Sequence, residues 1–122
     1  MSEVASYKAL VVWQRAMDLA VEIYRLTSKF PTSEQYRLIA QITRAAASVP
    51  ANIAEGNARA TRKDYANFLA IAKGSLMEAE TFLALAIRLK YLTGEDAARA
   101  LSFVTEISKM LTSLRKRLLE RE

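Results

Sequence analysis

Apolar residues recur every three or four positions along most of this chain, which is the spacing of one face of an α-helix. Four such stretches follow one another, and no segment alternates apolar and polar residues as a half-buried strand would. The first covers residues 10–29 and ends at Pro31, because the residue before a proline is disfavoured in the α region. We expect charged side chains to lie opposite the apolar side of this helix.

The second helix is predicted to open at Thr32, where Gln35 three residues later completes a capping-box pattern. Its apolar spacing continues to Gly56 and Asn57, a suitable C-terminal pair. Pro50 lies inside this stretch, removes one backbone hydrogen bond and crowds the carbonyl four residues earlier. We therefore expect a kink at Pro50 rather than the end of the helix.

The third helix is predicted to begin after Thr61, with Asp64 in the capping-box position, and to run to about Tyr91. Gly94 suits a left-handed residue that ends this helix. The fourth helix is predicted to begin at Glu95, an acid that the positive end of a helix favours. It continues through the last apolar position of its stripe, residue 118.

Connections of only a few residues force long helices to turn back on their neighbours. The chain has 122 residues, with 3 Gly and 2 Pro, which is a length for one core and a composition with few loops. The predicted fold is therefore all-α: an antiparallel up-and-down four-helix bundle, with its second helix kinked at Pro50, in a single domain over residues 1–122.

The residue types present exclude several kinds of chemistry. The chain has no cysteine and no histidine, which argues against zinc sites, disulfides and thiol nucleophiles. We accordingly predict no metal, no cofactor and no catalytic residue. No apolar stretch is long enough to span a membrane, and the first residues lack the pattern of a signal peptide. We expect a cytoplasmic protein without a membrane partner.

The net charge of +5 is compatible with binding to RNA or DNA. Basic residues are densest in two short runs, one before the third helix and one near the end of the fourth. The alternative is that both runs are solvated helix ends, and the second run is also favoured by the helix dipole. The candidate phosphate contacts are Arg59, Arg62, Lys63, Arg115, Lys116 and Arg117.

The third helix is weakly polar on the side opposite its core stripe, from Ala66 to Leu85, and the second carries a band of alanines. Helices without a charged side are usually buried on more than one side. We therefore predict a homo-oligomer, and the alternative is an alanine-rich solvent face. The candidate interface residues are Ala47, Ala51, Ala70, Gly74, Met77 and Leu85.

Polar residues surround Pro50 at helical spacing: Arg44, Ser48, Asn52 and Glu55. One interpretation is a polar site at the kink, shared between subunits. The interpretation that we favour is structural, with Ser48 and Asn52 bonding the backbone that Pro50 frees and Arg44 and Glu55 pairing with nearby charges. No nucleophile with an adjacent base is found among them.

Three segments carry a family resemblance: VWQRA (residues 12–16), RAAASVPANIAEG (residues 44–56) and FLAIAKGSLMEAE (residues 68–80). The chain resembles, over residues 10–118, the bacterial four-helix bundle family first noted in intervening sequences of 23S rRNA genes. The signature polar residues of that resemblance are Arg44, Ser48, Asn52, Glu55 and Glu78.

The resemblance implies four-helix protomers that assemble into five-membered rings or barrels. A related branch, the accessory variability protein of diversity-generating retroelements, is a basic pentamer that partners a reverse transcriptase and nucleic acid. The family has no established catalytic residues, so the resemblance implies a protein that is not an enzyme.

Two functions therefore remain as hypotheses. The first is a homo-oligomer, pentameric by resemblance, that associates with nucleic acid through its basic helix ends. The second is a scaffold that binds another protein through exposed apolar side chains and has no nucleic-acid role. The apolar candidates for such a contact are Met77, Leu85, Phe103 and Met110. An enzyme that uses Glu55, Glu78 or Glu80 is a more distant third.

Overall fold

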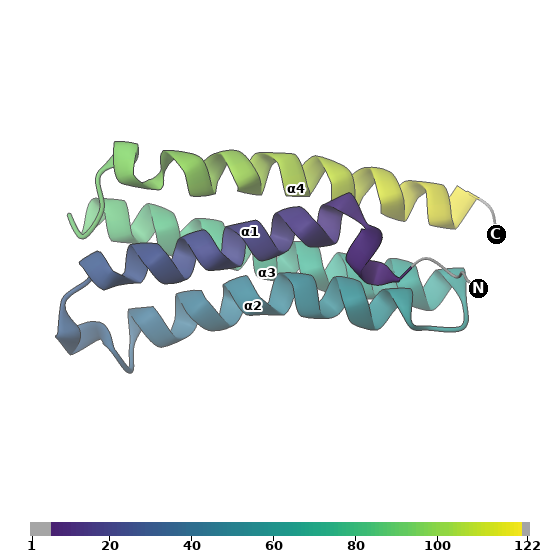
Figure 1. Cartoon of the computed structure of the whole chain (residues 1–122), viewed down its shortest axis with the longest axis horizontal. Helices are drawn as coiled ribbons and strands as arrows, with labels where there is room; N and C mark the ends of the chain where they lie inside the picture. Colours follow the sequence, from purple (N-terminus) through teal and green to yellow (C-terminus); the bar gives the residue numbers. More distant parts are fainter. Residues whose placement is uncertain (1–5, 121–122) are drawn as a thin grey trace.

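The computed structural model describes residues 6–120, which form four antiparallel α-helices and no strand (Figure 1). The helices are α1 (Val11–Leu26), α2 (Leu38–Asn57), α3 (Arg62–Arg88) and α4 (Gly94–Glu120). Short 3-10 turns precede α1 and occupy the α1–α2 connection: Tyr7–Ala9, Thr27–Lys29 and Thr32–Glu34. The predicted all-α four-helix bundle is confirmed.

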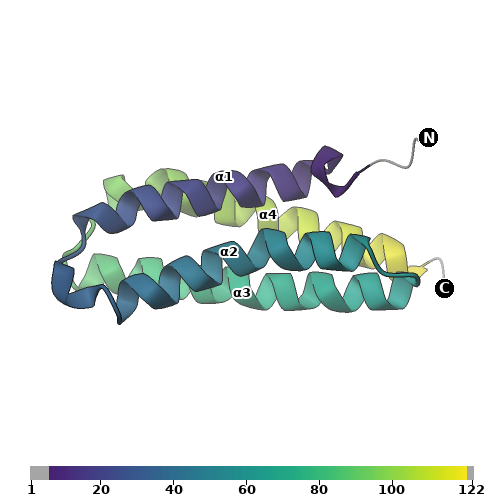
Figure 2. The ribbon, with the colours of Figure 1, turned by 60° about the horizontal axis from the view of Figure 1, so that its bottom comes forward.

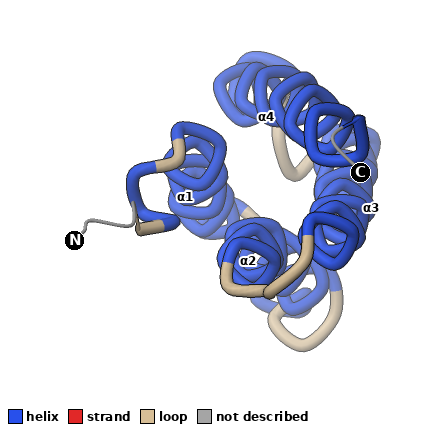
Figure 3. The backbone as a smooth tube through the Cα atoms, turned by 90° about the vertical axis from the view of Figure 1, so that its right-hand side faces the viewer, coloured by secondary structure: helices blue, strands red, loops and turns tan. Residues whose placement is uncertain are grey.

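Each helix packs against two others around one apolar core. α1 lies against α2 and α4, and α3 lies against the same two helices, so α1 and α3 occupy opposite corners of the bundle (Figure 3). All four helices contribute fully buried aliphatic side chains, among them Leu19, Ile23, Ile42, Ile53, Leu76, Leu83, Ile107 and Leu111. This arrangement leaves α1 and α3 with outer surfaces that face away from each other.

The predicted start of α2 at Thr32 is wrong. Thr32 begins a 3-10 turn and its side chain caps nothing, whereas α2 starts at Leu38. The cap comes from Glu34, whose Oε1 accepts the Leu38 N–H at 3.2 Å. Its other oxygen accepts the Tyr91 hydroxyl at 2.8 Å. This contact from the α3–α4 connection holds Glu34 in the capping position, so the helix begins later than the local pattern predicts.

The left-handed residue after α3 is Lys90, with a φ of 68°, and not Gly94. The N–H of Lys90 bonds the carbonyl of Ile87, and the N–H of Tyr91 bonds that of Ala86, which is the Schellman arrangement. Gly94 instead begins α4. The cap of α4 is reciprocal, because Thr93 and Asp96 each bond the other's backbone N–H at 2.9 Å.

At Thr61 the predicted cap of α3 is confirmed, since its hydroxyl accepts the Asp64 N–H at 3.1 Å. α2 continues through Pro50 as expected, and its axis changes direction near the middle of the helix (Figure 2).

Gly56 has a role that the sequence did not indicate. A Cβ there would lie 2.8 Å from the Cβ of Phe68, so this glycine allows α2 and α3 to pack closely.

The predicted division of α1 into a buried apolar side and an exposed charged side is wrong at three residues. Met17 and Tyr24 fit the apolar spacing of this helix but are exposed, because α1 packs mainly against two helices, α2 and α4, and both side chains lie beyond the edge of the core. Glu22, expected outside, is buried and bonds Arg25 at 2.7 Å. On α3, Ala66 was expected outside but is fully buried, since the Arg115 side chain from α4 bonds its carbonyl.

Candidate nucleic-acid interface

The two basic runs meet at one end of the bundle. The α2–α3 connection and the last turns of α4 lie at the same end, because α4 runs antiparallel to α3 (Figure 1). Arg115 joins them directly, since its Nε donates to the carbonyl of Ala66 in α3 at 3.2 Å. The fold therefore gathers all six candidate phosphate contacts, which two distant segments supply, around one end.

The basic residues before and within the first turn of α3 differ in how they are held. Arg59 bonds Glu55 at 3.3 Å, and its guanidinium lies 4.6 Å from the centre of the Phe68 ring. Arg62 and Lys63 are exposed in the first turn of α3, where the helix dipole adds to their positive potential. Arg59 is thus oriented by the fold, whereas Arg62 and Lys63 extend into solvent.

The three cations of α4 point into two different grooves. Arg115 and Lys116 line a groove between α3 and α4, and Arg117 lines a second groove between α1 and α4. The positive charge therefore surrounds the end of the bundle instead of forming one flat patch.

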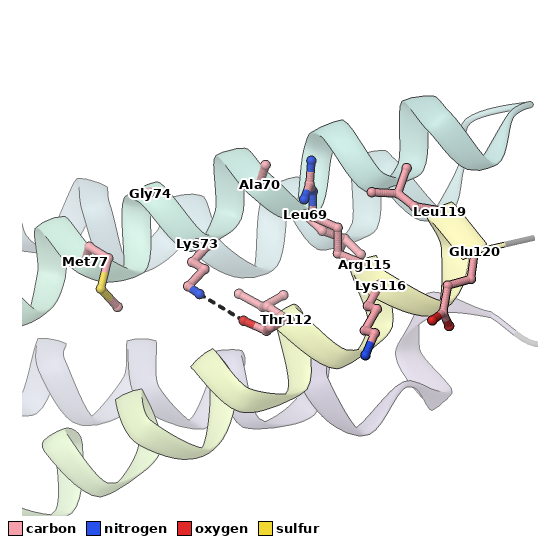
Figure 4. Close-up of a pocket in the computed structure, with 11 residues that line it drawn as sticks. Leu69, Ala70, Lys73, Gly74, Met77, Thr112, Arg115, Lys116, Leu119 and Glu120 are labelled. Atoms are coloured by element: carbon pink, nitrogen blue, oxygen red, sulfur yellow. Dashed lines mark hydrogen bonds between the residues drawn. The ribbon is translucent and has the colours of Figure 1, made fainter. Parts of the chain in front are cut away.

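The α3–α4 groove is the larger of the two, with a volume of about 710 Å³ (Figure 4). Apolar side chains such as Leu69 and Leu111 form part of its lining, and Lys73 Nζ bonds Thr112 Oγ1 across it at 2.9 Å. A Cβ at Gly74 would meet no atom within 4 Å, so the groove is open at this point.

All six residues predicted for an oligomer interface are exposed. They lie on two helices: Ala47 and Ala51 on α2, and Ala70, Gly74, Met77 and Leu85 on α3. Three of them (Ala70, Gly74 and Met77) line the α3–α4 groove beside the cations. Their contact with a second subunit stays a prediction.

A chain of polar side chains joins α2 to α3. The Asn52 amide donates to the Ser48 carbonyl at 2.8 Å and to the Ser48 hydroxyl at 2.9 Å. The hydroxyl of Ser75, which is almost fully buried, donates to the Ser48 hydroxyl at 2.9 Å. Our interpretation of Ser48 and Asn52 is therefore wrong in its detail, because the carbonyl that Pro50 frees belongs to Ala46.

Three of the signature polar residues meet in a second depression between α2 and α3, with a volume of about 200 Å³. Arg44, Ser48 and Glu78 line it together with Ser75. Glu55 lies apart and pairs locally with Arg59, as we expected. Arg44 forms no ion pair with any other residue of the described chain, so the local pairing expected for it is absent there.

The comparison with known proteins decides the family. The family model described as "23S rRNA-intervening sequence protein" matches residues 8–113. The chain belongs to this family. A similar solved structure, from Bacteroides thetaiotaomicron, is described as a protein with unknown function from the S23 ribosomal protein family. The two chains are 34% identical, the match covers 87% of this chain and 99% of that one, and the TM-score is 0.76. A search of curated proteins found no match.

In this member of the 23S rRNA-intervening sequence protein family, the perturbed carboxyls lie away from the basic end. The Tyr91 hydroxyl and the Leu38 N–H lower the pKa of Glu34, and the Thr93 backbone lowers that of Asp96. Among residues 6–120, no cluster of three or more carboxylates could hold a metal ion. No described helix is long and apolar enough to cross a membrane. The family and structural descriptions name no enzymatic activity.

Two hydrogen bonds between helices were not predicted from the sequence, Ser75 with Ser48 and Lys73 with Thr112. Ser75 lies inside the second family segment, but its contact with Ser48 depends on how α2 packs against α3. Lys73 and Thr112 meet only because α3 and α4 are antiparallel neighbours. The one available signal was the helical spacing of the polar positions, which gives a side of a helix but no partner.

Proposed function

We propose that this protein is an oligomeric, nucleic-acid-associated helical bundle that contacts the phosphate backbone with its basic end. The observation that carries the proposal is the gathering of six exposed cations at one end from two segments of the chain. Within the described residues, only Arg59 of the six forms an ion pair. The other five cations are therefore available to neutralise phosphates.

The arrangement favours binding without base recognition. The cations of α4 line two different grooves of the bundle end and do not form a single row, so we expect them to contact phosphates rather than base edges. Backbone contacts of this kind release counterions, so the affinity falls steeply with salt concentration. Membership in the family supports this proposal only by analogy. The family's name refers to genes that lie within 23S rRNA intervening sequences and does not describe RNA binding.

The test is a titration of labelled RNA and DNA duplexes over a series of salt concentrations. Replacing Arg62, Lys63 and Lys116 with Ala should make the plot of log affinity against log salt less steep by about 2 to 3, since each lost phosphate contact removes about 0.9 from the slope on DNA.

The matched control removes the same charge at the other end of the bundle. Arg37, Arg88 and Arg99, which lie in the α1–α2 connection, at the end of α3 and in the first turns of α4, are replaced with Ala. The control should keep the wild-type slope. Equal losses in both triple variants, or no binding of the wild type at physiological salt, would contradict the proposal.

A protein-binding scaffold is the second candidate, and the apolar part of the α3–α4 groove supports it. Met77 and Leu85 are exposed, whereas Phe103 and Met110 are half-buried and contribute less surface. Recovery of one defined protein partner that Leu85→Glu releases, together with a flat salt response to nucleic acid, would favour the scaffold.

A further inference from the structure

Facing residues of α2 and α3 line the smaller depression between these two helices. The hydrogen bond between Ser48 and Ser75 sets this pair of residues level with each other. Because the two helices are antiparallel neighbours (Figure 2), four residues back along α2 and three forward along α3 lead in the same direction, by about 6 Å and about 4.5 Å. Arg44 and Glu78 therefore stand at nearly the same height, on opposite sides of a space of about 200 Å³.

Arg44 and Glu78 carry opposite charges that do not neutralise each other. Among residues 6–120, neither forms an ion pair with the other or with a third residue. The depression therefore has a positive side on α2 and a negative side on α3. A molecule that lies between them meets both charges.

The two hydroxyls at the end of this depression retain one proton. A hydroxyl donates one hydrogen bond and accepts up to two. The Ser48 hydroxyl accepts from Asn52 and from Ser75, each at 2.9 Å, so its own proton remains to be donated. Ser75 is only 8% exposed, and polar groups buried to this degree are hydrogen-bonded with few exceptions. We expect the acceptor of the remaining proton to come from solution.

We propose that this depression binds a small α-amino acid. Arg44 and Ser48 lie one turn apart on α2, so both can donate to the carboxylate of the ligand. Glu78 faces them from α3 and accepts from the ammonium group. A purely anionic ligand would lie against Glu78 without a partner for that charge, and a purely cationic one would do so against Arg44, so the site selects a molecule that carries both charges.

The size of the depression limits the ligand to small amino acids. A water molecule takes about 30 Å³ in the liquid, so about 200 Å³ corresponds to about six or seven non-hydrogen atoms. Alanine and serine have this size, whereas an aromatic amino acid is much larger. Ala45, which is buried, and Phe82, which is half-buried, supply an apolar part of the lining that suits a methyl group.

The proposal goes beyond the proposed function and does not depend on it. The depression lies along the first half of α2 and the second half of α3, from Gln41 to Ser48 and from Ser75 to Phe82. The candidate phosphate contacts lie at the other end of these helices. Either binding activity can therefore be present without the other.

The test compares three probes of similar size, with binding to the full-length protein followed through the NMR shifts of its backbone amides. L-alanine carries both charges, propionate only the negative one and L-alaninamide only the positive one. L-alanine should saturate with a dissociation constant of about 1 mM or lower, and each of the other two should bind at least about tenfold more weakly. The shifted amides should be those around Ser48, Ser75 and Glu78.

Two variants assign the charges. Arg44→Gln should weaken the binding of L-alanine about tenfold and leave that of L-alaninamide unchanged. Glu78→Gln should weaken the binding of L-alanine and leave that of propionate unchanged. The matched controls are Arg88→Gln and Glu95→Gln, which remove exposed charges outside the depression and should keep the affinity of the wild type. Circular dichroism verifies that the helices form in each variant.

Three outcomes would overturn the proposal. The first is no saturation with L-alanine below about 10 mM. The second is a single-charge probe that binds as tightly as L-alanine, which would show that the paired charges select nothing. The third is an equal loss of affinity in a control variant, which would place the binding outside this depression.

Discussion

α3 packs against its two neighbours in different ways. Against α2 the contact is closer, because Gly56 brings the backbones together and Ser75 bonds Ser48 at 2.9 Å, and the depression between the two helices has a volume of only about 200 Å³. Against α4 it stays open, with a groove of about 710 Å³ that Lys73 crosses to reach Thr112.

The contrast shows that small residues in a helix do not all serve the same purpose. Gly56 faces a neighbour in its own protomer, and an added Cβ would collide there. Gly74 faces open space, and an added Cβ would touch nothing. A pattern of small residues predicts that another helix packs closely at that position. Only the structure shows whether a helix of the same protomer already packs there, as at Gly56, or whether the position is open, as at Gly74.

The largest effect should come from closing the space at Gly56. Gly56→Ala places a methyl group against Phe68 and Tyr65, and we expect a loss of about 1–3 kcal/mol in the free energy of unfolding from overpacking. Urea denaturation measures this loss. Gly74→Ala is the matched control and should gain about 0.5–1 kcal/mol from helix propensity. A destabilising Gly74→Ala would mean that the α3–α4 side is also closed.

A smaller effect should come from the polar chain between α2 and α3. Ser75→Ala removes the hydrogen bond to Ser48, and we expect a loss of about 1 kcal/mol because the hydroxyl is buried. Thr112→Ala removes the bond to Lys73 on the exposed side and should change stability by less than about 0.5 kcal/mol. Equal losses in the two variants would remove the distinction between the two sides of α3.

The smallest effect concerns pH and the end of the bundle remote from the basic residues. Bonds from Tyr91 and Leu38 lower the pKa of Glu34 in the folded protein. The resulting stability is present above the unfolded pKa, near 4.3, and is lost as the pH falls through the lower folded value. The melting temperatures of wild type and Glu34→Gln should therefore converge between about pH 5 and pH 3. A difference that stays constant with pH would show that charge has no part in this contact.

Periodicity predicted the helices because burial of an apolar side dominates helix formation in a bundle. It failed at Thr32 and Gly94 because the helix ends depend on the Tyr91 contact and on the Schellman turn at Lys90. The Tyr91 contact joins residues that are distant in sequence, and Lys90 and Gly94 are both local candidates for the left-handed residue that ends α3. The sequence therefore predicts that a helix exists better than it predicts where the helix begins and ends.

The candidate site was predictable in its residues and less so in its geometry. The basic runs were visible as charge density, and antiparallel packing follows from short connections. The split of Arg115 and Arg117 between two grooves depends on rotation about the α4 axis, which the sequence leaves undetermined to this accuracy. The exposure of Met17 and Tyr24 was missed because both residues fit the core stripe of α1 by periodicity alone.

The order of contacts in the bundle has a consequence for folding kinetics. The packed helix pairs are neighbours in sequence, except for α1 with α4. Contacts of short sequence separation cost little chain entropy, so such bundles fold within microseconds to milliseconds. The α1–α4 contact, fastened by Arg15 and Glu106, closes the longest loop and should form last.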